Sequence, residues 1–235
     1  MKELSFIFYI LYGSSALLII IGTFRSFIRE GKYIRNEWKD ELLELNDITV
    51  IIPFRNEQDR IKALIESINV SKEQPNHFIF VDDHSSDLTT QIIESQLKIT
   101  NFIIVSVDLE GKKQAIKRGV NEASTKFILT LDADVIFSKT YFSKFKRLGR
   151  RDMIILPVIM QGKGWKRIFE MDVDLSAVLN CSTAGLGNPI LASGANLLFS
   201  KEAYLNYSNV EVHSHIASGD DVFLLNNFKK NECSI

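Results

Sequence analysis

The chain has 235 residues, which is enough for one sizeable domain with an appendage. Its 28 basic and 29 acidic residues leave a net charge of -1, and no polybasic tract occurs, so a nucleic-acid partner is not expected. The two cysteines lie far apart and fit no paired spacing, which argues against a disulfide framework and against a cysteine-rich metal site.

The segment from Leu4 to Phe24 carries no charge and is long enough to cross a bilayer as a helix that rises about 1.5 Å per residue. We therefore predict a transmembrane helix in residues 1–24 and interpret the charged residues 25–47 as a juxtamembrane connector. A cleaved signal peptide is the alternative, but its apolar region would be shorter and would end in small residues. Arg25 and Arg29 follow the apolar run, whereas only Lys2 precedes it, which predicts a single-pass protein of the cell (inner) membrane with everything after Phe24 in the cytoplasm.

After residue 47, apolar runs alternate with helical patterns. The runs 48–52, 77–81, 102–107 and 127–131 are typical of strands buried on both faces of a parallel sheet. Residues 57–69, 87–98 and 111–123 carry apolar side chains at three- and four-residue spacing, which predicts helices. The alternation indicates a doubly wound α/β fold, in which ligands bind beyond the carboxyl ends of the strands.

The last third of the chain changes character. Residues 152–160 are predicted as a strand, and residues 165–180 as an amphipathic helix that lies against the membrane or against a bound substrate. An ordinary helix packed on the sheet is the alternative. A Gly- and Ser-rich loop then leads into another strand, and a final helix begins at Asp220.

Polar residues gather where the predicted strands end. The following residues occupy these positions: Pro53, Arg55, Asn56, Glu57, Asp82, Asp83, Asp87, Asp132 and Asp134. Asp87 suits the cap of the helix that follows it. Since neighbouring side chains on a strand point to opposite sides, only one of Asp82 and Asp83 is expected to face the cleft.

Asp132 and Asp134 are separated by one alanine and follow an apolar run. If the strand extends that far, both carboxylates point the same way, and their repulsion favours a cation between them. The alternative is a turn in which each aspartate caps the chain that follows. Gly111 and Lys112 begin a helix and suit an anionic group such as phosphate, with a solvated basic turn as the alternative.

Taken in order, these segments resemble the family-two inverting glycosyltransferases, which have the GT-A fold. The matching pieces are VIIPFRNE, FVDDHSSD, GKKQAIKRGV, LDADV, SGANLLFSKEAY and GDDVFLL. The resemblance implies a GT-A-like doubly wound mixed sheet in residues 48–235, preceded by the membrane helix. It also implies transfer of a sugar from a nucleotide-sugar donor to a polysaccharide, lipid or lipid-linked acceptor.

The resemblance implies roles for the polar residues. The nucleotide-sugar would be held by a set consisting of Pro53, Asn56, Glu57, Asp83, Lys112 and Asp132. Asp132 and Asp134 would form the DxD pair that binds Mg²⁺ or Mn²⁺, with Asp134 as the more direct ligand. Asp221 would be the general base, while Asp220 stands where the family usually has glutamate. Family members continue to an acceptor-side motif beyond this helix, so the domain in this sequence is expected to be C-terminally incomplete.

Two other functions remain open at this point. A membrane-tethered nucleotide-sugar-binding protein without catalysis would share every motif, and only turnover separates it from the enzyme. A receiver domain of a response regulator is suggested by VDDHSSD followed by LDADV. However, a complete strand and helix precede the acidic strand here, whereas a receiver's pattern would begin at that strand.

Overall fold

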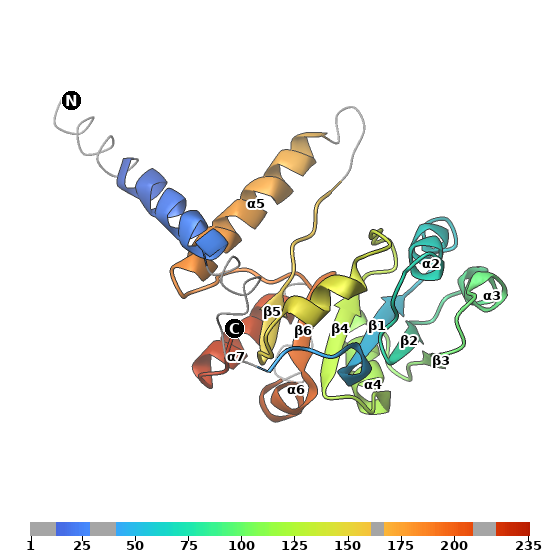
Figure 1. Ribbon diagram of the computed structural model, residues 1–235. Helices are drawn as coiled ribbons and strands as arrows, with labels where there is room; N and C mark the ends of the chain where they lie inside the picture. The colour runs from blue at the N-terminus through green and yellow to red at the C-terminus, as the bar shows by residue number, and fades with distance from the viewer. Residues whose placement is uncertain (1–12, 29–40, 161–166, 209–219) are drawn as a thin grey trace. The chain divides into compact units, whose positions relative to one another are not determined.

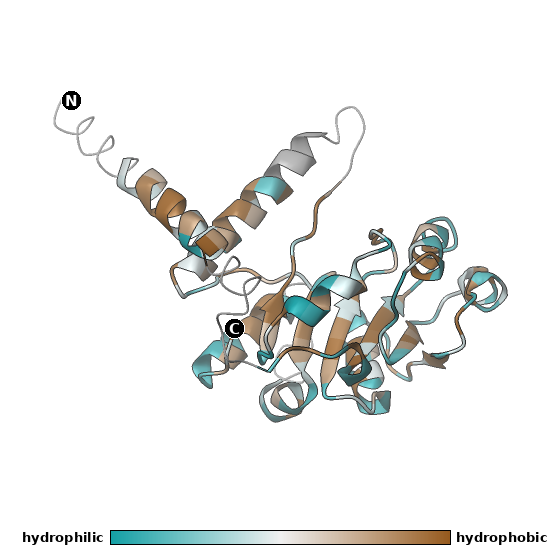
Figure 2. Ribbon diagram, in the orientation of Figure 1, coloured by the Kyte–Doolittle hydropathy of each residue, from teal (hydrophilic) through white to brown (hydrophobic). Residues whose placement is uncertain are grey.

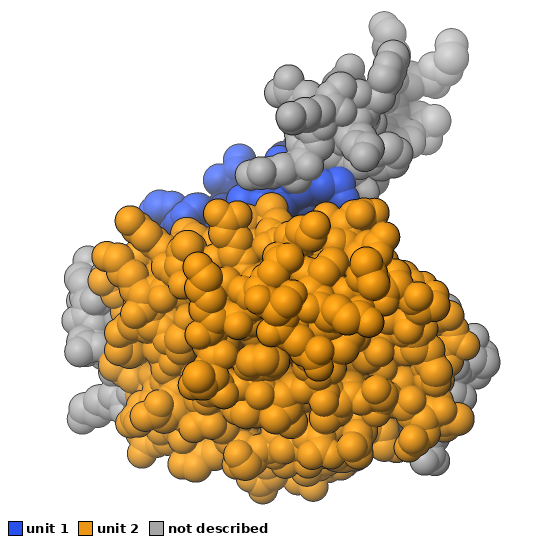
Figure 3. Space-filling model, turned by 90° about the vertical axis from the view of Figure 1, so that its right-hand side faces the viewer, with its two compact units in different colours: residues 1–39, 157–192 blue, residues 40–156, 193–235 orange. Residues whose placement is uncertain are grey.

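The computed structural model describes residues 13–28, 41–160, 167–208 and 220–235. The chain divides into two compact units, which Figure 3 shows in different colours: unit 1 comprises residues 1–39 and 157–192, and unit 2 comprises residues 40–156 and 193–235. Within the described ranges, no helix combines the length and the apolarity needed to span a membrane. Residues 4–12 of the predicted transmembrane segment and residues 29–40 of the connector lie outside these ranges.

Unit 2 contains a six-stranded mixed sheet with the order β3-β2-β1-β4-β6-β5 (Figure 1). Its strands are β1 (Ile48–Phe54), β2 (His77–Asp82), β3 (Phe102–Ser106), β4 (Phe127–Leu131), β5 (Met153–Ile155) and β6 (Asn196–Ser200). The first four strands pair in parallel, whereas β6 runs antiparallel to both β4 and β5. The predicted α/β mixed sheet is confirmed. The receiver interpretation is wrong, since receivers have the flavodoxin-like strand order 2-1-3-4-5.

Helices cover both faces of the parallel strands. Every residue of β1 and β4 is buried, as the continuous apolar runs predicted. The helices α2 (Ile61–Asn69) and α3 (Thr89–Gln96) lie beside each other and contribute to the core that also contains Val50 and Ile52. The helix α4 (Lys112–Glu122) packs on the other face, where a Cβ added to Gly119 would lie 2.6 Å from Ile51. A glycine is therefore needed for this close approach of helix and strand.

The structure differs from the predicted elements in the last third. The predicted strand 152–160 is limited to β5, which ends at Ile155, and Pro157 two residues later cannot donate to a strand ladder. A short helix, α6 (Lys201–Tyr207), was not predicted; the hydroxyl of Ser200 caps it by accepting from the N–H of Ala203 at 3.3 Å. The final helix α7 (Asp220–Lys230) begins where expected.

In unit 1, a helix over residues 13–28 crosses α5 (Arg167–Gly185) at small residues. A Cβ added to Gly22 would lie 2.3 Å from the carbonyl oxygen of Ser182, and one added to Gly185 would lie 1.9 Å from that of Gly22. Ser26 also donates a hydrogen bond to the carbonyl of Cys181 at 2.6 Å. Figure 2 shows apolar residues along the helix over 13–28. Such close backbone contact is typical of helices that pair through glycine in membranes.

Candidate functional site

The predicted site residues of unit 2 follow the carboxyl ends of neighbouring parallel strands. β1 ends at Phe54, β2 at Asp82 and β4 at Leu131, so the loops that carry the polar side chains start from one edge of the sheet. Pro53 is the exception: it was expected after the first strand but lies buried within β1, one residue before the strand ends. The N–H of Asp83 donates to the carbonyl of Phe54 at 2.9 Å, which keeps the ends of β1 and β2 in register.

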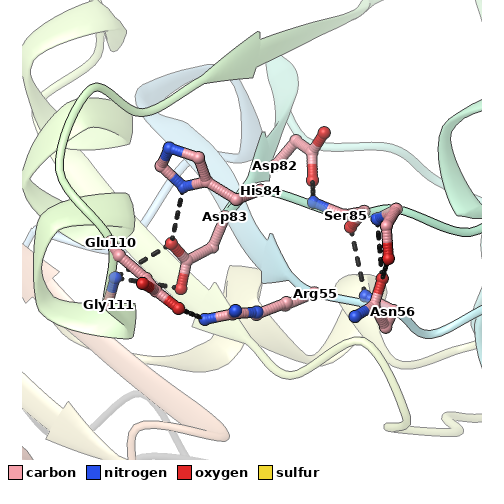
Figure 4. A network of polar contacts seen from close by, with 9 residues as sticks. Arg55, Asn56, Asp82, Asp83, His84, Ser85, Glu110 and Gly111 are labelled. Carbon is pink, nitrogen blue, oxygen red and sulfur yellow. Dashed lines mark hydrogen bonds and ion pairs between the residues drawn. The ribbon is translucent and has the colours of Figure 1, made fainter.

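Asp83 holds the start of α4. Its two carboxylate oxygens accept the backbone N–H of Gly111 at 2.9 and 3.0 Å, and the residue is 6% exposed (Figure 4). Gly111 has φ +126°, a left-handed conformation that favours glycine. Asp82 points away from Asp83 and accepts the N–H of Ser85 at 2.9 Å (Figure 4). The prediction that the two carboxylates diverge is confirmed.

Asn56 joins the loops after β1 and β2. Its N–H donates to Ser85 Oγ at 3.1 Å, and its Oδ1 accepts the N–H of Ser86 at 2.8 Å (Figure 4). Its φ of 51° lies in the left-handed region, which asparagine tolerates better than most residues. Arg55 forms an ion pair with Glu110, a residue that sequence reasoning did not single out. Asp87 was predicted to cap the following helix, but the N-cap of α3 is Leu88, without a side-chain cap. The Asp87 carboxylate instead accepts the N–H groups of Thr89 at 3.0 Å and Gln58 at 3.1 Å, which ties the loops after β1 and β2 together.

Glu57 is tied to the metal-binding candidate Asp134 through Arg60. The Glu57 carboxylate contacts Arg60 at 2.7 Å from Nε and 2.8 Å from Nη2, and Arg60 Nη1 lies 3.4 Å from Asp134 Oδ2. Burial raises the pKa of Glu57; Arg60 opposes this rise, while the charges of Asp134 and Asp132 add to it. Sequence reasoning missed Arg60, although the i,i+3 spacing from Glu57 to Arg60 could have indicated an ion pair.

Asp132 and Asp134 lie in a turn, not on an extended strand. β4 ends at Leu131, and the N–H of Val135 donates to the carbonyl of Asp132 at 3.1 Å. The two carboxylates therefore do not share a strand face, and each has its own cationic neighbour. Lys112 Nζ donates to Asp132 Oδ1 at 2.6 Å, whereas Asp134 faces Arg60. The structure thus brings Lys112 from the start of α4 to the turn after β4.

The turn after β4 offers hard oxygen donors for a divalent cation. Among the residues that the structure describes, no group of three or more His, Cys, Asp and Glu side chains could hold a metal ion. Mg²⁺ is usually bound by one or two carboxylates together with substrate phosphates and water. The Asp132 and Asp134 carboxylates fit this pattern, and their contacts with Lys112 and Arg60 show that the turn attracts positive charge.

Asp221, near the start of α7, contacts the turn formed by residues 193–196. Its Oδ2 accepts the N–H of Gly194 at 2.8 Å, and its Oδ1 accepts the N–H of Val222 at 2.9 Å. The carbonyl of Ala195, the next residue in this turn, accepts the N–H of Asp132 at 3.4 Å. Asp221 is therefore linked to the DxD segment through one short turn. The side chain of Asp220 lies outside the described part of the chain.

Comparisons with known proteins show the family and the fold. The family model described as glycosyl transferase family 2 matches residues 49–171, a range that contains every candidate site residue except Asp221. Poly-beta-1,6-N-acetyl-D-glucosamine synthase of Staphylococcus aureus is 29% identical over 138 residues, which are 58% of this chain and 34% of that protein. The chain thus spans about a third of the length of the curated relatives it matches.

Two solved structures share the fold. Staphylococcus aureus TarS 1-349 in complex with UDP-GlcNAc has a TM-score of 0.53 at 16% identity, covering 77% of this chain and 53% of that one. The mannosyltransferase PcManGT of Pyrobaculum calidifontis, in complex with GDP-Man and Mn²⁺, has a TM-score of 0.57 at 15% identity, covering 88% of this chain and 61% of that one. Because the family model matches more than half of its length, the chain belongs to glycosyl transferase family 2.

Proposed function

We propose that this protein is a membrane-anchored inverting glycosyltransferase that moves a sugar from a nucleotide-sugar donor to a polysaccharide, lipid or lipid-linked acceptor. One observation carries the proposal: Asp83 fixes the start of α4 so that Lys112 reaches Asp132 at 2.6 Å, beside Asp134. Groups suited to a nucleoside, a diphosphate and a cation thus follow one another along a single edge of the sheet.

The start of α4 and Lys112 would hold the diphosphate. A helix N-terminus carries partial positive charge and unsatisfied N–H groups, and the Lys112 ammonium adds a full charge beside them. The nucleoside would lie across the loops that Asn56 and Asp83 organise, where backbone groups and carboxylates provide donors and acceptors. PcManGT and TarS, whose structures contain GDP-Man and UDP-GlcNAc, make a nucleotide-sugar the natural ligand class.

Asp134 and Asp132 would hold Mg²⁺ or Mn²⁺ with the help of phosphate oxygens. When bound, the cation supplies neutralisation of the charge that builds on the leaving diphosphate. Lys112 and Arg60 already place positive charge against the two carboxylates, so both side chains must share these oxygens with the cation or move away from them. The Mn²⁺ in the PcManGT complex supports this assignment.

Asp221 would take the proton from the attacking hydroxyl of the acceptor. An inverting transfer needs a base on the face of the sugar opposite to the leaving diphosphate. The hydrogen bonds from Gly194 and Val222 fix the Asp221 carboxylate in one orientation while it remains partly accessible. The turn at residues 193–196 connects Asp221 with Asp132, which would keep the base at a fixed distance from the bound nucleotide-sugar.

A bilayer would hold unit 1. On the helix over residues 13–28, Leu17, Ile20, Phe24 and Phe27 are each between 57% and 65% exposed. Leu175 of α5, which pairs with this helix, is 58% exposed. Such a set of exposed large apolar side chains is unusual on a water-facing surface and fits lipid contact. The basic residues after Phe24 support an inner-membrane location with unit 2 in the cytoplasm.

Calorimetry on the full chain in detergent tests donor binding. UDP and GDP are each titrated into the protein, once in the presence of Mn²⁺ and once in the presence of a chelator. At least one of the two nucleotides is expected to bind more tightly with Mn²⁺, because the carboxylates and the diphosphate repel each other until a cation bridges them. Asp134→Ala should abolish the difference, whereas the control Asp59→Ala, at an exposed loop position, should keep it. Equal affinity with and without the cation would remove the metal from the proposal. The binding protein without catalysis is separated from the enzyme only by turnover.

A further inference from the structure

The turn formed by residues 193–196 contacts both sides of the candidate site. It is closed by a hydrogen bond from the N–H of Asn196 to the carbonyl of Ser193 at 3.1 Å. The N–H of Gly194 donates outward to Asp221, and the carbonyl of Ala195 accepts from Asp132. The positions of Gly194 and Ala195 therefore set where the Asp221 carboxylate lies relative to the DxD segment.

The side chain of Asn196 is held by Tyr141. Tyr141 Oη donates to Asn196 Oδ1 at 2.5 Å, and Asn196 is 7% exposed. Asn196 also pairs with Leu131, the residue directly before Asp132. Burial raises the pKa of the Tyr141 hydroxyl above its ordinary range, although the hydrogen bond with Asn196 opposes this, so the hydroxyl stays protonated as a donor.

Tyr141 has little freedom to move. Its ring contacts Phe137, Phe142 and Phe145, with centroid distances of 4.9, 5.1 and 5.2 Å. Phe142 and Phe145 are buried in the main core. The segment that follows Asp134 thus carries a rigid aromatic cluster. The hydroxyl of Tyr141 extends from this cluster to Asn196 in the turn at residues 193–196.

We propose that Tyr141 and Asn196 are positioning residues for the transfer reaction, because their hydrogen bond fixes the turn that orients Asp221 relative to the DxD segment. This inference rests on the proposed function. Neither side chain is placed at the reacting atoms; both act through the peptide groups of Gly194 and Ala195. The pair connects the segment after the metal-binding turn with the base.

Tyr141→Phe removes the hydrogen bond and keeps the aromatic packing. A small displacement of a base lowers turnover more than it weakens substrate binding. We therefore expect kcat to fall about 5- to 10-fold, while KM for the donor and the affinity for UDP or GDP with Mn²⁺ change by less than about twofold. Tyr207→Phe is the matched control. It also removes one tyrosine hydroxyl, but Tyr207 belongs to α6 and not to the turn at residues 193–196, so kcat should stay unchanged. Asn196→Ala should resemble Tyr141→Phe.

A double-mutant cycle on the full chain in detergent separates positioning from general stabilisation. If Tyr141 acts through Asp221, the effect of Tyr141→Phe on kcat disappears when it is combined with Asp221→Asn. A role limited to stability would lower kcat by the same factor in both backgrounds. That result, or an unchanged kcat in Tyr141→Phe, would overturn the inference.

Hydrogen exchange of the ligand-free chain gives a readout without turnover. Tyr141→Phe should speed exchange of the amides in residues 193–197, and Tyr207→Phe should not. If the wild-type chain transfers no sugar but this exchange changes as expected, the proposed function fails while the hold of Tyr141 on the turn stands. If exchange at residues 193–197 does not change, the inference fails whatever the activity.

Discussion

The carboxylate of Asp83 accepts the backbone N–H of Gly111 through both of its oxygens, at 2.9 and 3.0 Å. This contact is buried and sets the start of α4, from which Lys112 reaches Asp132. Asp83→Asn turns one acceptor into a donor that faces the Gly111 N–H. We expect the affinity for the nucleoside diphosphate to fall at least about tenfold, and stability to fall by about 1–3 kcal/mol.

Asp82→Asn is the matched control for this substitution, because Asp82 is adjacent but accepts from Ser85 in its own loop and not from the start of α4. Titration of UDP and GDP with Mn²⁺ measures the affinities, and thermal unfolding measures the stabilities. An Asp83→Asn variant that binds as tightly as the wild type would show that the α4 start does not depend on this carboxylate.

The pKa of Glu57 is raised by burial, and Asp134 and Asp132 add to the rise against the opposing effect of Arg60. In the folded state, the Glu57 carboxyl therefore stays protonated to a higher pH than in the unfolded state. Stability from this group is present below its ordinary pKa and is lost as the pH rises through the raised value. We expect the melting temperature of the wild type minus that of Glu57→Gln to decrease as the pH rises from about 4 to about 6.

Thermal unfolding of both variants in steps across this range checks the prediction. Glu66→Gln serves as the control, since Glu66 occupies an exposed site on α2. A wild type that gains stability over Glu57→Gln as the pH rises would contradict the sign of the shift.

Gly22 and Gly185 allow the helix over residues 13–28 to touch α5. Because a Cβ on Gly22 would meet the Ser182 carbonyl at 2.3 Å, Gly22→Leu should force the helices apart. The Ser26 hydroxyl reaches the backbone carbonyl of Cys181 at 2.6 Å, so the two residues are close, and a Ser26→Cys chain should form a cross-link between residue 26 and Cys181 on mild oxidation. Adding Gly22→Leu should reduce that cross-link several-fold.

Gly13→Leu in the same Ser26→Cys chain is the control, because no atom of the described residues lies within 4 Å of a Cβ at Gly13. The cross-link is read by mass spectrometry of the chain in vesicles of anionic lipid. If Gly22→Leu and Gly13→Leu give equal yields, the helices do not depend on this crossing.

Much of unit 2 could be predicted from the sequence because its strands are buried on both faces. Continuous apolar runs marked β1 to β4 within one or two residues, and fold-level reasoning placed Asp83, Lys112 and Asp132 at one edge. The end of β4 could not be located in this way, since the apolar pattern of residues 127–137 continues through the turn. The aspartates were expected to share a strand face only if β4 extended to them.

The roles of Arg60 and Tyr141 were not apparent from the sequence, for a different reason. Both act through contacts between residues far apart in the chain: Arg60 to Asp134, and Tyr141 to Asn196. The i,i+3 spacing from Glu57 to Arg60 indicates the ion pair between those two residues but not the contact with Asp134, and no local pattern connects Tyr141 with Asn196. The helix α6 was missed because its cap, Ser200, ends a strand and begins the helix without a loop between them.

Transfer by the wild-type chain and by Asp221→Asn is the most direct test of the central claim. Full chains in detergent with Mn²⁺ are given UDP- and GDP-sugars together with polysaccharide, lipid and lipid-linked acceptors, and release of nucleoside diphosphate is measured. The account predicts acceptor-dependent release by the wild type and a rate about 10²-fold lower for Asp221→Asn, with nucleotide affinity nearly intact. Asp220→Asn should lose less. Undiminished transfer by Asp221→Asn would contradict the account, since Asp221 would then serve only to hold Gly194 and the start of α7.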